Sequence, residues 1–279
     1  MRWLGRKSSS NVEDRRGMGG GGLAIGGGLG TVVIVVISLL LGKNPLEYIN
    51  TGQEQPTEQA TSEESNQQAK FVGVVLQDTE DIWTAIFQEQ LHKQYEQPKL
   101  VLFSGSTQSG CGSASAATGP FYCPLDRKVY IDLSFYDELQ QRFKAPGDFA
   151  MAYVVAHEVG HHIQTLLGIS DKMRQMQEGA SEAEANALSV KLELQADFFA
   201  GVWAFHEQKM KDVLDAGDVE EALGAANAIG DDRLQKQSQG YIVPDAFTHG
   251  TSAQRVKWFK KGYETGDISQ GDTFNAEDL

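Results

Sequence analysis

The feature that constrains this chain most is a helical pattern between Asp148 and Gly168 that carries the segment VVAHEVGHHIQ. Apolar residues recur there at helical spacing, and Asp148 and Gly168 suit the start and the end of a helix. The pattern predicts a helix of about 19 residues that is buried over much of its surface. Histidines and a glutamate in a buried helix are costly without a partner, so other elements must cover this helix around a polar site.

The spacing of the polar residues in this helix predicts a zinc site. His157 and His161 are one turn apart and project from the same face, so two imidazole nitrogens can reach one metal ion. Glu158 lies beside His157, where it can reach a water on the metal without ligating it. We therefore expect one Zn²⁺ per chain, with His157 and His161 as ligands and Glu158 as the catalytic base.

A second apolar helix offers the third ligand. It begins at Ser181, which forms a capping box with Glu184, and it carries Glu193 and Asp197 one turn apart. Zinc hydrolases usually supply three protein ligands. In the subclass with the pattern HExxHxxGxxH the third ligand is a histidine, but that position is Leu167 here. We assign Glu193 as the ligand and Asp197 as the partner that holds a histidine ring, with Asp197 as the alternative ligand.

The N-terminal part of the chain predicts a membrane anchor. Residues 1–22 are rich in arginine and lysine, and the uncharged stretch LAIGGGLGTVVIVVISLLL that follows would span about 28 Å as a helix. A cleaved signal peptide would show an A-x-A-like site, which LLLGKNPLEY lacks. The positive-inside rule then predicts a single-pass membrane protein, anchored by residues 23–42. Residues 1–22 are expected in the cytoplasm, and the catalytic domain is expected in the periplasm or outside the cell.

Residues 43–70 contain few large apolar side chains and predict a flexible linker, so the folded domain is expected at 71–279. Outside the cytoplasm, Cys111 and Cys123 would form a disulfide worth about 2–3 kcal/mol in the chain-entropy model. In the cytoplasm they would be two free thiols. The net charge of −14 argues against a nucleic-acid partner, because phosphate binding needs clustered lysine and arginine.

Several separated motifs together resemble one family. HEVGHH followed by LELQADFFAGVWA resembles the bacterial neutral zinc metallopeptidases of the membrane-anchored type, as do MRWLGRKSSSNVEDRRG, GPFYCPLDRKVYIDLSFYDEL and FTHGTSAQRVKWFKKGYETGD. The resemblance implies an α+β, predominantly helical zincin-like domain with a small sheet, preceded by one transmembrane helix. It also implies the gluzincin arrangement, in which Glu193 ligates zinc and Asp197 orients His157.

Two further elements carry roles by resemblance. The spacing in THGTSAQR is similar to a T-H-x₅-R element of membrane-associated gluzincin endopeptidases, which implies that His249 acts in catalysis and that Arg255 supports the site. Alternatively, His249 caps local structure and Arg255 pairs with a surface acid. The alternating segment Lys128–Phe135 predicts a half-buried strand. The resemblance makes it a candidate for the edge strand that pairs with substrate.

The sequence therefore predicts a zinc-dependent endopeptidase that acts on a peptide or protein and is held to the membrane through residues 23–42. Two other functions stay open. One is a membrane-tethered interaction module whose zinc is structural, for which Glu158 would have no use. The other is a metallohydrolase that cuts a non-peptide amide. The oligomeric state does not follow from the sequence.

Overall fold

The computed structural model of the chain describes residues 1–17 and 62–279. Residues 1–15 and 62–279 form one compact unit. Within the described ranges, no helix combines the length and the apolar character that crossing a bilayer requires. The predicted anchor at 23–42 and residues 43–61 of the predicted linker lie outside the described residues.

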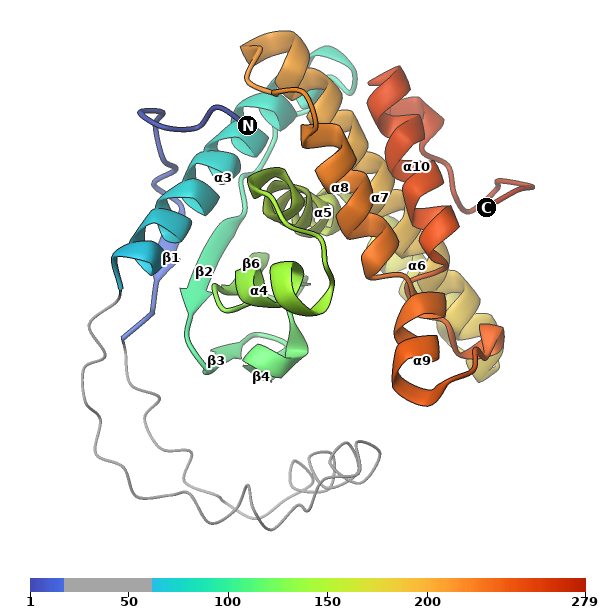
Figure 1. Ribbon diagram of the computed structural model, residues 1–279. Coiled ribbons are helices and arrows are strands. Elements are labelled where there is room, and N and C mark those ends of the chain that lie inside the picture. The colour runs from blue at the N-terminus through green and yellow to red at the C-terminus, as the bar shows by residue number, and fades with distance from the viewer. Residues whose placement is uncertain (18–61) are drawn as a thin grey trace. The chain divides into compact units, whose positions relative to one another are not determined.

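One half of the unit contains a four-stranded sheet with strands in the order β1, β2, β6 and β5 (Figure 1). Strand β1 (Val12–Asp14) is parallel to β2 (Lys99–Phe103), and β2 is parallel to β6 (Lys128–Asp132). Strand β5 (Phe121–Cys123) is antiparallel to β6 and forms one edge. With the helices described below, the fold is mostly helical with a small sheet, as the sequence predicts.

Strand β6 confirms the predicted strand but not its predicted position or exposure. It pairs with β2 on one side and β5 on the other, so it is not an edge strand. Val129, Tyr130 and Ile131 are all almost completely buried, which shows that both faces of the strand are covered. Tyr130 lies on the face predicted to be exposed, where it stacks on Phe121. The edge strands of this sheet are β1 and β5 instead.

The predicted disulfide between Cys111 and Cys123 is present. It joins the turn of a small antiparallel hairpin, formed by β3 (Ser106–Ser109) and β4 (Gly112–Ser115), to the last residue of the edge strand β5. The edge strand is therefore tied covalently to a neighbouring part of the chain.

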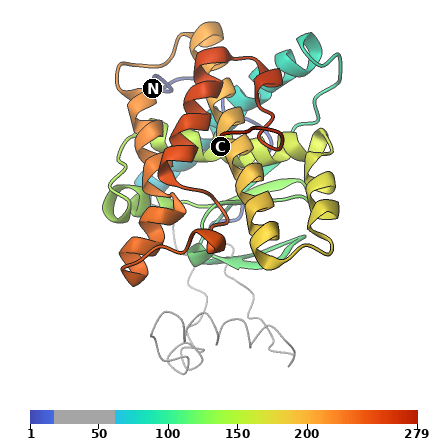
Figure 2. The ribbon, with the colours of Figure 1, turned by 90° about the vertical axis from the view of Figure 1, so that its right-hand side faces the viewer.

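Helices make up most of the rest of the unit. Helix α5 (Asp148–Leu166) carries HEVGH, and it passes behind α7 (Glu182–Lys211) and α10 (Ser252–Thr265) in Figure 2. The other helices and helical turns are α3 (Glu63–Glu89), η1 (Ala116–Thr118), α4 (Phe135–Asp137), η2 (Glu138–Arg142), α6 (Ile169–Gln177), α8 (Asp218–Ala228), α9 (Asp231–Gln239), η3 (Pro244–Ala246) and η4 (Ile268–Gln270). Because α5 is covered by α3, α7, α8, β5 and β6, it forms the centre of the core.

The two ends of α5 lie close to where the sequence predicts them, but the N-cap is one residue earlier. Gly168 adopts the left-handed conformation expected just after the helix. At the start, however, the N-cap is Gly147 and Asp148 is the first helical residue. The carboxylate of Glu221 accepts a hydrogen bond from the Phe149 amide at 3.0 Å, and Asp148 accepts one from the Trp3 indole at 3.0 Å. Glu221 of α8 therefore takes over the capping that was predicted for Asp148.

The domain also begins differently from the prediction. Residues 1–15 belong to the same compact unit as residues 62–279, and β1 adds a strand to the free edge of β2. Helix α3 begins at Glu63, within the segment predicted as linker and eight residues before the predicted start at Phe71. The polar first turns of α3 form a helix because Ser62 caps them, accepting a hydrogen bond from the Ser65 amide at 3.1 Å.

Glycines allow the backbones of α5, α7 and α10 to come into direct contact where the helices cross. A Cβ atom at Gly160 would lie 2.9 Å from the carbonyl oxygen of Ala196, across the contact between α5 and α7. At the crossing of α7 and α10, a Cβ at Gly262 would lie 2.1 Å from the carbonyl oxygen of Phe198. No side chain fits at either place, so these glycines determine how closely the three helices pack.

We predict that Gly262→Ala destabilises the protein by about 1–3 kcal/mol, because the added methyl group must push α10 away from α7. The matched control is Gly224→Ala in α8, where a Cβ meets no atom within 4 Å. There the change should stabilise the helix by about 0.5–1 kcal/mol. Urea unfolding of both variants measures the difference. Equal stability of the two variants would show that the α7–α10 crossing has room to adjust.

Candidate metal centre

Helices α5 and α7 bring three metal-ligating side chains together. His157 and His161 on α5 and Glu193 on α7 each offer a ligand atom, and these atoms all lie within 4.8 Å of one another. Nε2 of His157 is 3.1 Å from one carboxylate oxygen of Glu193, and Nε2 of His161 is 3.4 Å from the other. The structure therefore assembles the three residues that the sequence predicts as ligands.

Hydrogen bonds hold both imidazole rings so that each Nε2 atom faces the carboxylate of Glu193. Nδ1 of His157 lies 2.8 Å from the carboxylate of Asp197, and Nδ1 of His161 lies 2.9 Å from the side-chain oxygen of Gln164. Each of these oxygens can accept a hydrogen bond from the Nδ1–H group, which turns Nε2 of each ring toward Glu193, where it can bind a metal once it is deprotonated. Two such nitrogens and one carboxylate are a donor set that zinc uses in catalytic sites.

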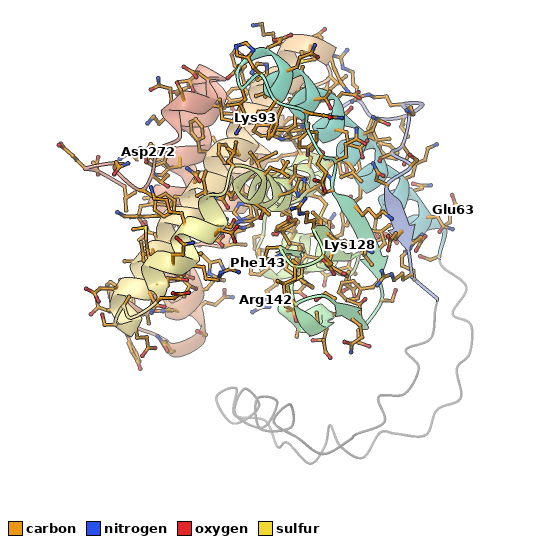
Figure 3. The ribbon with its side chains drawn as sticks, turned by 180° about the vertical axis from the view of Figure 1, so that it is seen from behind. Glu63, Lys93, Lys128, Arg142, Phe143 and Asp272 are labelled. Carbon is orange, nitrogen blue, oxygen red and sulfur yellow. A yellow bond between two sulfur atoms is a disulfide. The ribbon has the colours of Figure 1, made fainter. Side chains whose placement is uncertain are left out.

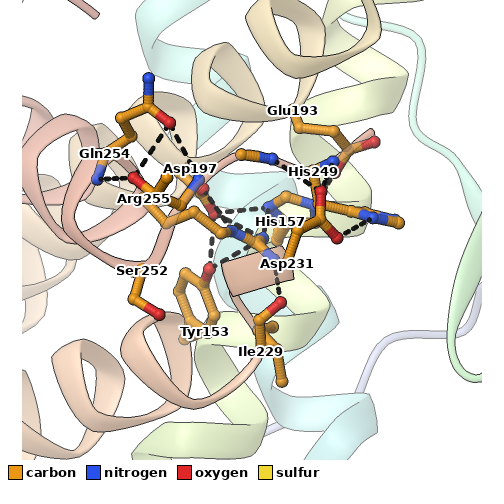
Figure 4. A network of polar contacts seen from close by, with 12 residues as sticks. Tyr153, His157, Glu193, Asp197, Ile229, Asp231, His249, Ser252, Gln254 and Arg255 are labelled. Carbon is orange, nitrogen blue, oxygen red and sulfur yellow. Dashed lines mark hydrogen bonds and ion pairs between the residues drawn. The ribbon is translucent and has the colours of Figure 1, made fainter. Parts of the chain in front are cut away.

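Asp197 is the most connected residue beneath the site (Figure 4). Its carboxylate is completely buried and also accepts hydrogen bonds from the hydroxyl of Tyr153 and from the guanidinium of Arg255 at 2.8 Å. Burial by itself would raise the pKa of Asp197, but Arg255 and His157 outweigh it and hold the pKa at about 2. The carboxylate is therefore ionised whenever the protein is folded near neutral pH.

The charge of Asp197 acts in turn on His157. Burial by itself would lower the pKa of this imidazole, but Asp197 and Glu193 outweigh the effect and raise it to about 10. A metal that binds Nε2 of His157 must therefore displace a proton. Arg255 is 2% exposed, and its place beside Asp197 excludes the alternative in which it pairs with a surface acid.

Gln164 is a positioning residue that the sequence did not reveal. It is completely buried three residues after His161. Its amide nitrogen donates to the carbonyl of Leu192 at 2.6 Å and to the side chain of Gln195, which fixes its oxygen toward His161. A buried glutamine so close to HExxH could have served as a signal. By contrast, His162 points away from the metal group and bonds to the Glu96 carbonyl and Tyr122.

His249 lies beside the metal group on the loop before α10 (Figure 4). Its Nδ1 is 3.2 Å from Asp231, and the other oxygen of Asp231 accepts the backbone amides of Thr248, His249 and Gly250. This hydrogen bond raises the pKa of His249 above its ordinary value. Asp231, which sequence reasoning missed, thus fixes both the loop and the imidazole.

The metal group opens into a cleft of about 890 Å³ between the helices and the sheet. Glu158 lines this cleft beside the metal group, and its side chain is not one of the three that converge. Residues of the edge strand β5, the residues before it and residues of α6 also line the cleft. Figure 3 shows Arg142 and Phe143, also lining residues, between the two halves.

Comparison with known proteins agrees with this geometry. The family model described as "Putative neutral zinc metallopeptidase" matches residues 1–274. The chain is 52% identical to the uncharacterized protein YpfJ of Escherichia coli K12 over 285 residues, which cover 98% of this chain and 99% of YpfJ. It is 46% identical to the uncharacterized protein Rv2575 of Mycobacterium tuberculosis H37Rv, over 66% of this chain and 65% of that protein. No solved structure matches.

We predict that Glu193→Ala loses zinc at ordinary concentrations, because only two protein ligands remain. Asp197→Asn keeps three ligands but loosens His157, so zinc affinity should fall about 10–100-fold. A titration with a competing chelator measures both variants, with circular dichroism as the control for folding. Zinc retained by Glu193→Ala and lost by Asp197→Asn would reverse the two roles.

Proposed function

Because the chain belongs to the neutral zinc metallopeptidase family, we propose that it is a zinc-dependent endopeptidase whose centre is built from His157, His161 and Glu193. The observation that carries the proposal is the convergence of two Nε2 atoms and one carboxylate, with both Nδ1 atoms held by other side chains. Bound zinc would polarise the scissile carbonyl and lower the pKa of a water to about 7.

Glu158 is proposed as the general base. It precedes the second histidine ligand on the same helix and lines the cleft without being part of the ligand group. From this position the carboxylate can accept the proton of the attacking water and pass it to the leaving amine. The side chain is 7% exposed, so few water molecules compete for it.

His249 is proposed to donate a hydrogen bond to the oxygen that becomes negatively charged. Its bond to Asp231 fixes the ring and favours the protonated form, which is the form able to donate. A donor that is already oriented before the reaction stabilises the developing charge without a cost of reorganisation. Its side chain is about half exposed and lines the same cleft as the metal group.

The edge of β5 is proposed to bind substrate as an added strand. Gly119, Pro120, Phe121 and Tyr122 line the cleft, and β5 pairs with β6 on only one side. An extended peptide can use the free backbone groups of such an edge. The free edge of β5 favours a peptide substrate over another amide, because the regularly spaced N–H and C=O groups of a peptide backbone can pair with a strand. The open cleft also argues against a structural zinc site, which is normally closed by a fourth protein ligand.

The anchor at 23–42 and the location of the domain outside the cytoplasm stay predictions. The disulfide between Cys111 and Cys123 supports an oxidising compartment.

We predict that Glu158→Gln abolishes peptide hydrolysis and keeps zinc, because the amide cannot accept a proton while the three ligands remain. Cleavage of a peptide library and metal content are measured on the same preparation. The control is Glu89→Gln, an exposed change at the end of α3 that should leave both values unchanged. Loss of zinc together with activity would mean that Glu158 has been given the wrong role.

We predict that His249→Ala lowers kcat about 10²–10³-fold with little change in KM or zinc content, because the lost donor acts on the transition state. His249→Gln can still donate a hydrogen bond and should recover part of the rate. Full activity in His249→Ala would remove this residue from the mechanism.

A further inference from the structure

The N-terminal segment, residues 1–15, packs over a cluster of buried acids that shares no residue with the metal group. The guanidinium of Arg6 pairs with Asp78 on α3 and, at 3.2 Å, with Glu207 on α7. Asp78 is 1% exposed and Glu207 is completely buried. Lys211 is the second cation that pairs with Asp78.

This cluster depends on the cations around it. One carboxylate oxygen of Asp78 and one of Glu207 have no hydrogen-bond partner. Burial, together with the charge of Asp78, raises the pKa of Glu207 to about 8, so its charged form needs the cations beside it. Removing Arg6 would leave two buried acids with a single cation, an arrangement that is strongly destabilising.

A second buried acid is held by the same segment. Glu80 on α3 is 3% exposed. It accepts hydrogen bonds from the hydroxyl of Ser9 at 2.6 Å and from the side-chain amide of Asn11 at 2.7 Å. A buried carboxylate without such donors would carry the full cost of desolvation.

The segment also completes the sheet and the apolar packing. Val12, Glu13 and Asp14 pair with Leu100, Val101 and Leu102 in the parallel register of β1 and β2. Glu13 forms an ion pair with Lys128 of β6 at 2.9 Å. The indole of Trp3 packs edge-on against Phe71 of α3. The N-terminal segment therefore contacts the rest of the unit through ion pairs, side-chain hydrogen bonds, strand pairing and apolar packing. Such a combination is typical of an integral part of a domain.

We propose that residues 1–15 lie on the same side of the membrane as residues 62–279, because the two ranges form one compact unit. This departs from the predicted orientation, in which one crossing separates residues 1–22 from the catalytic domain. A single crossing would take β1 away from β2 and Arg6 away from Asp78 and Glu207.

The charges that gave the predicted orientation have partners within the domain. Arg6 neutralises the buried cluster, Arg15 pairs with Glu13 at 2.7 Å, and Arg2 lies 3.4 Å from Asp215. These three arginines are among the five basic residues that the positive-inside rule counted in residues 1–22. At least these three charges therefore have a role within the folded unit, which weakens the case for residues 1–22 as a cytoplasmic tail.

Accessibility of single cysteines in cells tests the proposal on the full chain. Ser10→Cys places a thiol at an exposed position of the N-terminal segment, and Lys260→Cys places one at an exposed position of α10. Spheroplasts are treated with a membrane-impermeant maleimide before and after permeabilisation, and the unaltered chain controls for the native cysteine pair. The two thiols should react under the same condition. Reaction of one from outside and of the other only after permeabilisation would overturn the proposal.

The packing itself is tested on the purified full chain with Arg6→Gln. Loss of the guanidinium should lower the midpoint of thermal unfolding by about 6 °C or more, because Glu207 loses the cation that pairs with it and Asp78 keeps only Lys211. Lys7→Gln is the matched control, since it removes the same charge from the exposed neighbouring residue and should change the midpoint little. Equal midpoints for the two variants would show that Arg6 does not cover the acidic cluster in solution.

Discussion

The rest of the structure depends on the hydrogen bonds and the ion pair made by the buried carboxylate of Asp197. It lies on α7 and accepts hydrogen bonds from Tyr153 and His157 on α5 and from Arg255 on α10. A buried anion is tolerated only when donors and an opposite charge surround it. The three central helices must therefore meet at this point. The same contact fixes the ring of His157, so the stability of the core and the geometry of the metal group rest on one group of atoms.

Close helix packing is the condition for this meeting. Gly160 lies between His157 and His161 in sequence and lets α5 approach the backbone of α7 at Ala196. Gly201 and Gly262 do the same for α7 and α10. Larger residues would separate the helices and lengthen the hydrogen bonds to Asp197. These glycines therefore set the distances between the helices that carry the metal group, although none of the glycines faces the cleft.

The same physical rule applies at a second place. Asp78, Glu80 and Glu207 are buried acids that are not metal ligands, and side chains of residues 1–15 supply partners for each of them. Both places join parts of the chain that are distant in sequence. The two places have different effects. The contacts of Asp197 determine where the side chains of the metal group lie, and the contacts of Asp78, Glu80 and Glu207 determine which parts of the chain fold together.

The sequence by itself determined the local features: the helix of HEVGH, the capping box at Ser181, the convergence of His157 and His161 on one face, and the candidates Glu193 and Asp197. These follow from the periodicity of a helix, which depends only on neighbouring residues. The disulfide and the approach of Arg255 to the site were also anticipated. Only the tertiary structure decided that β5 forms the edge, that Gln164 and Asp231 hold the histidines, and that residues 1–15 belong to the domain. Strand order and buried ion pairs depend on contacts between residues far apart in the chain, and no local pattern records them.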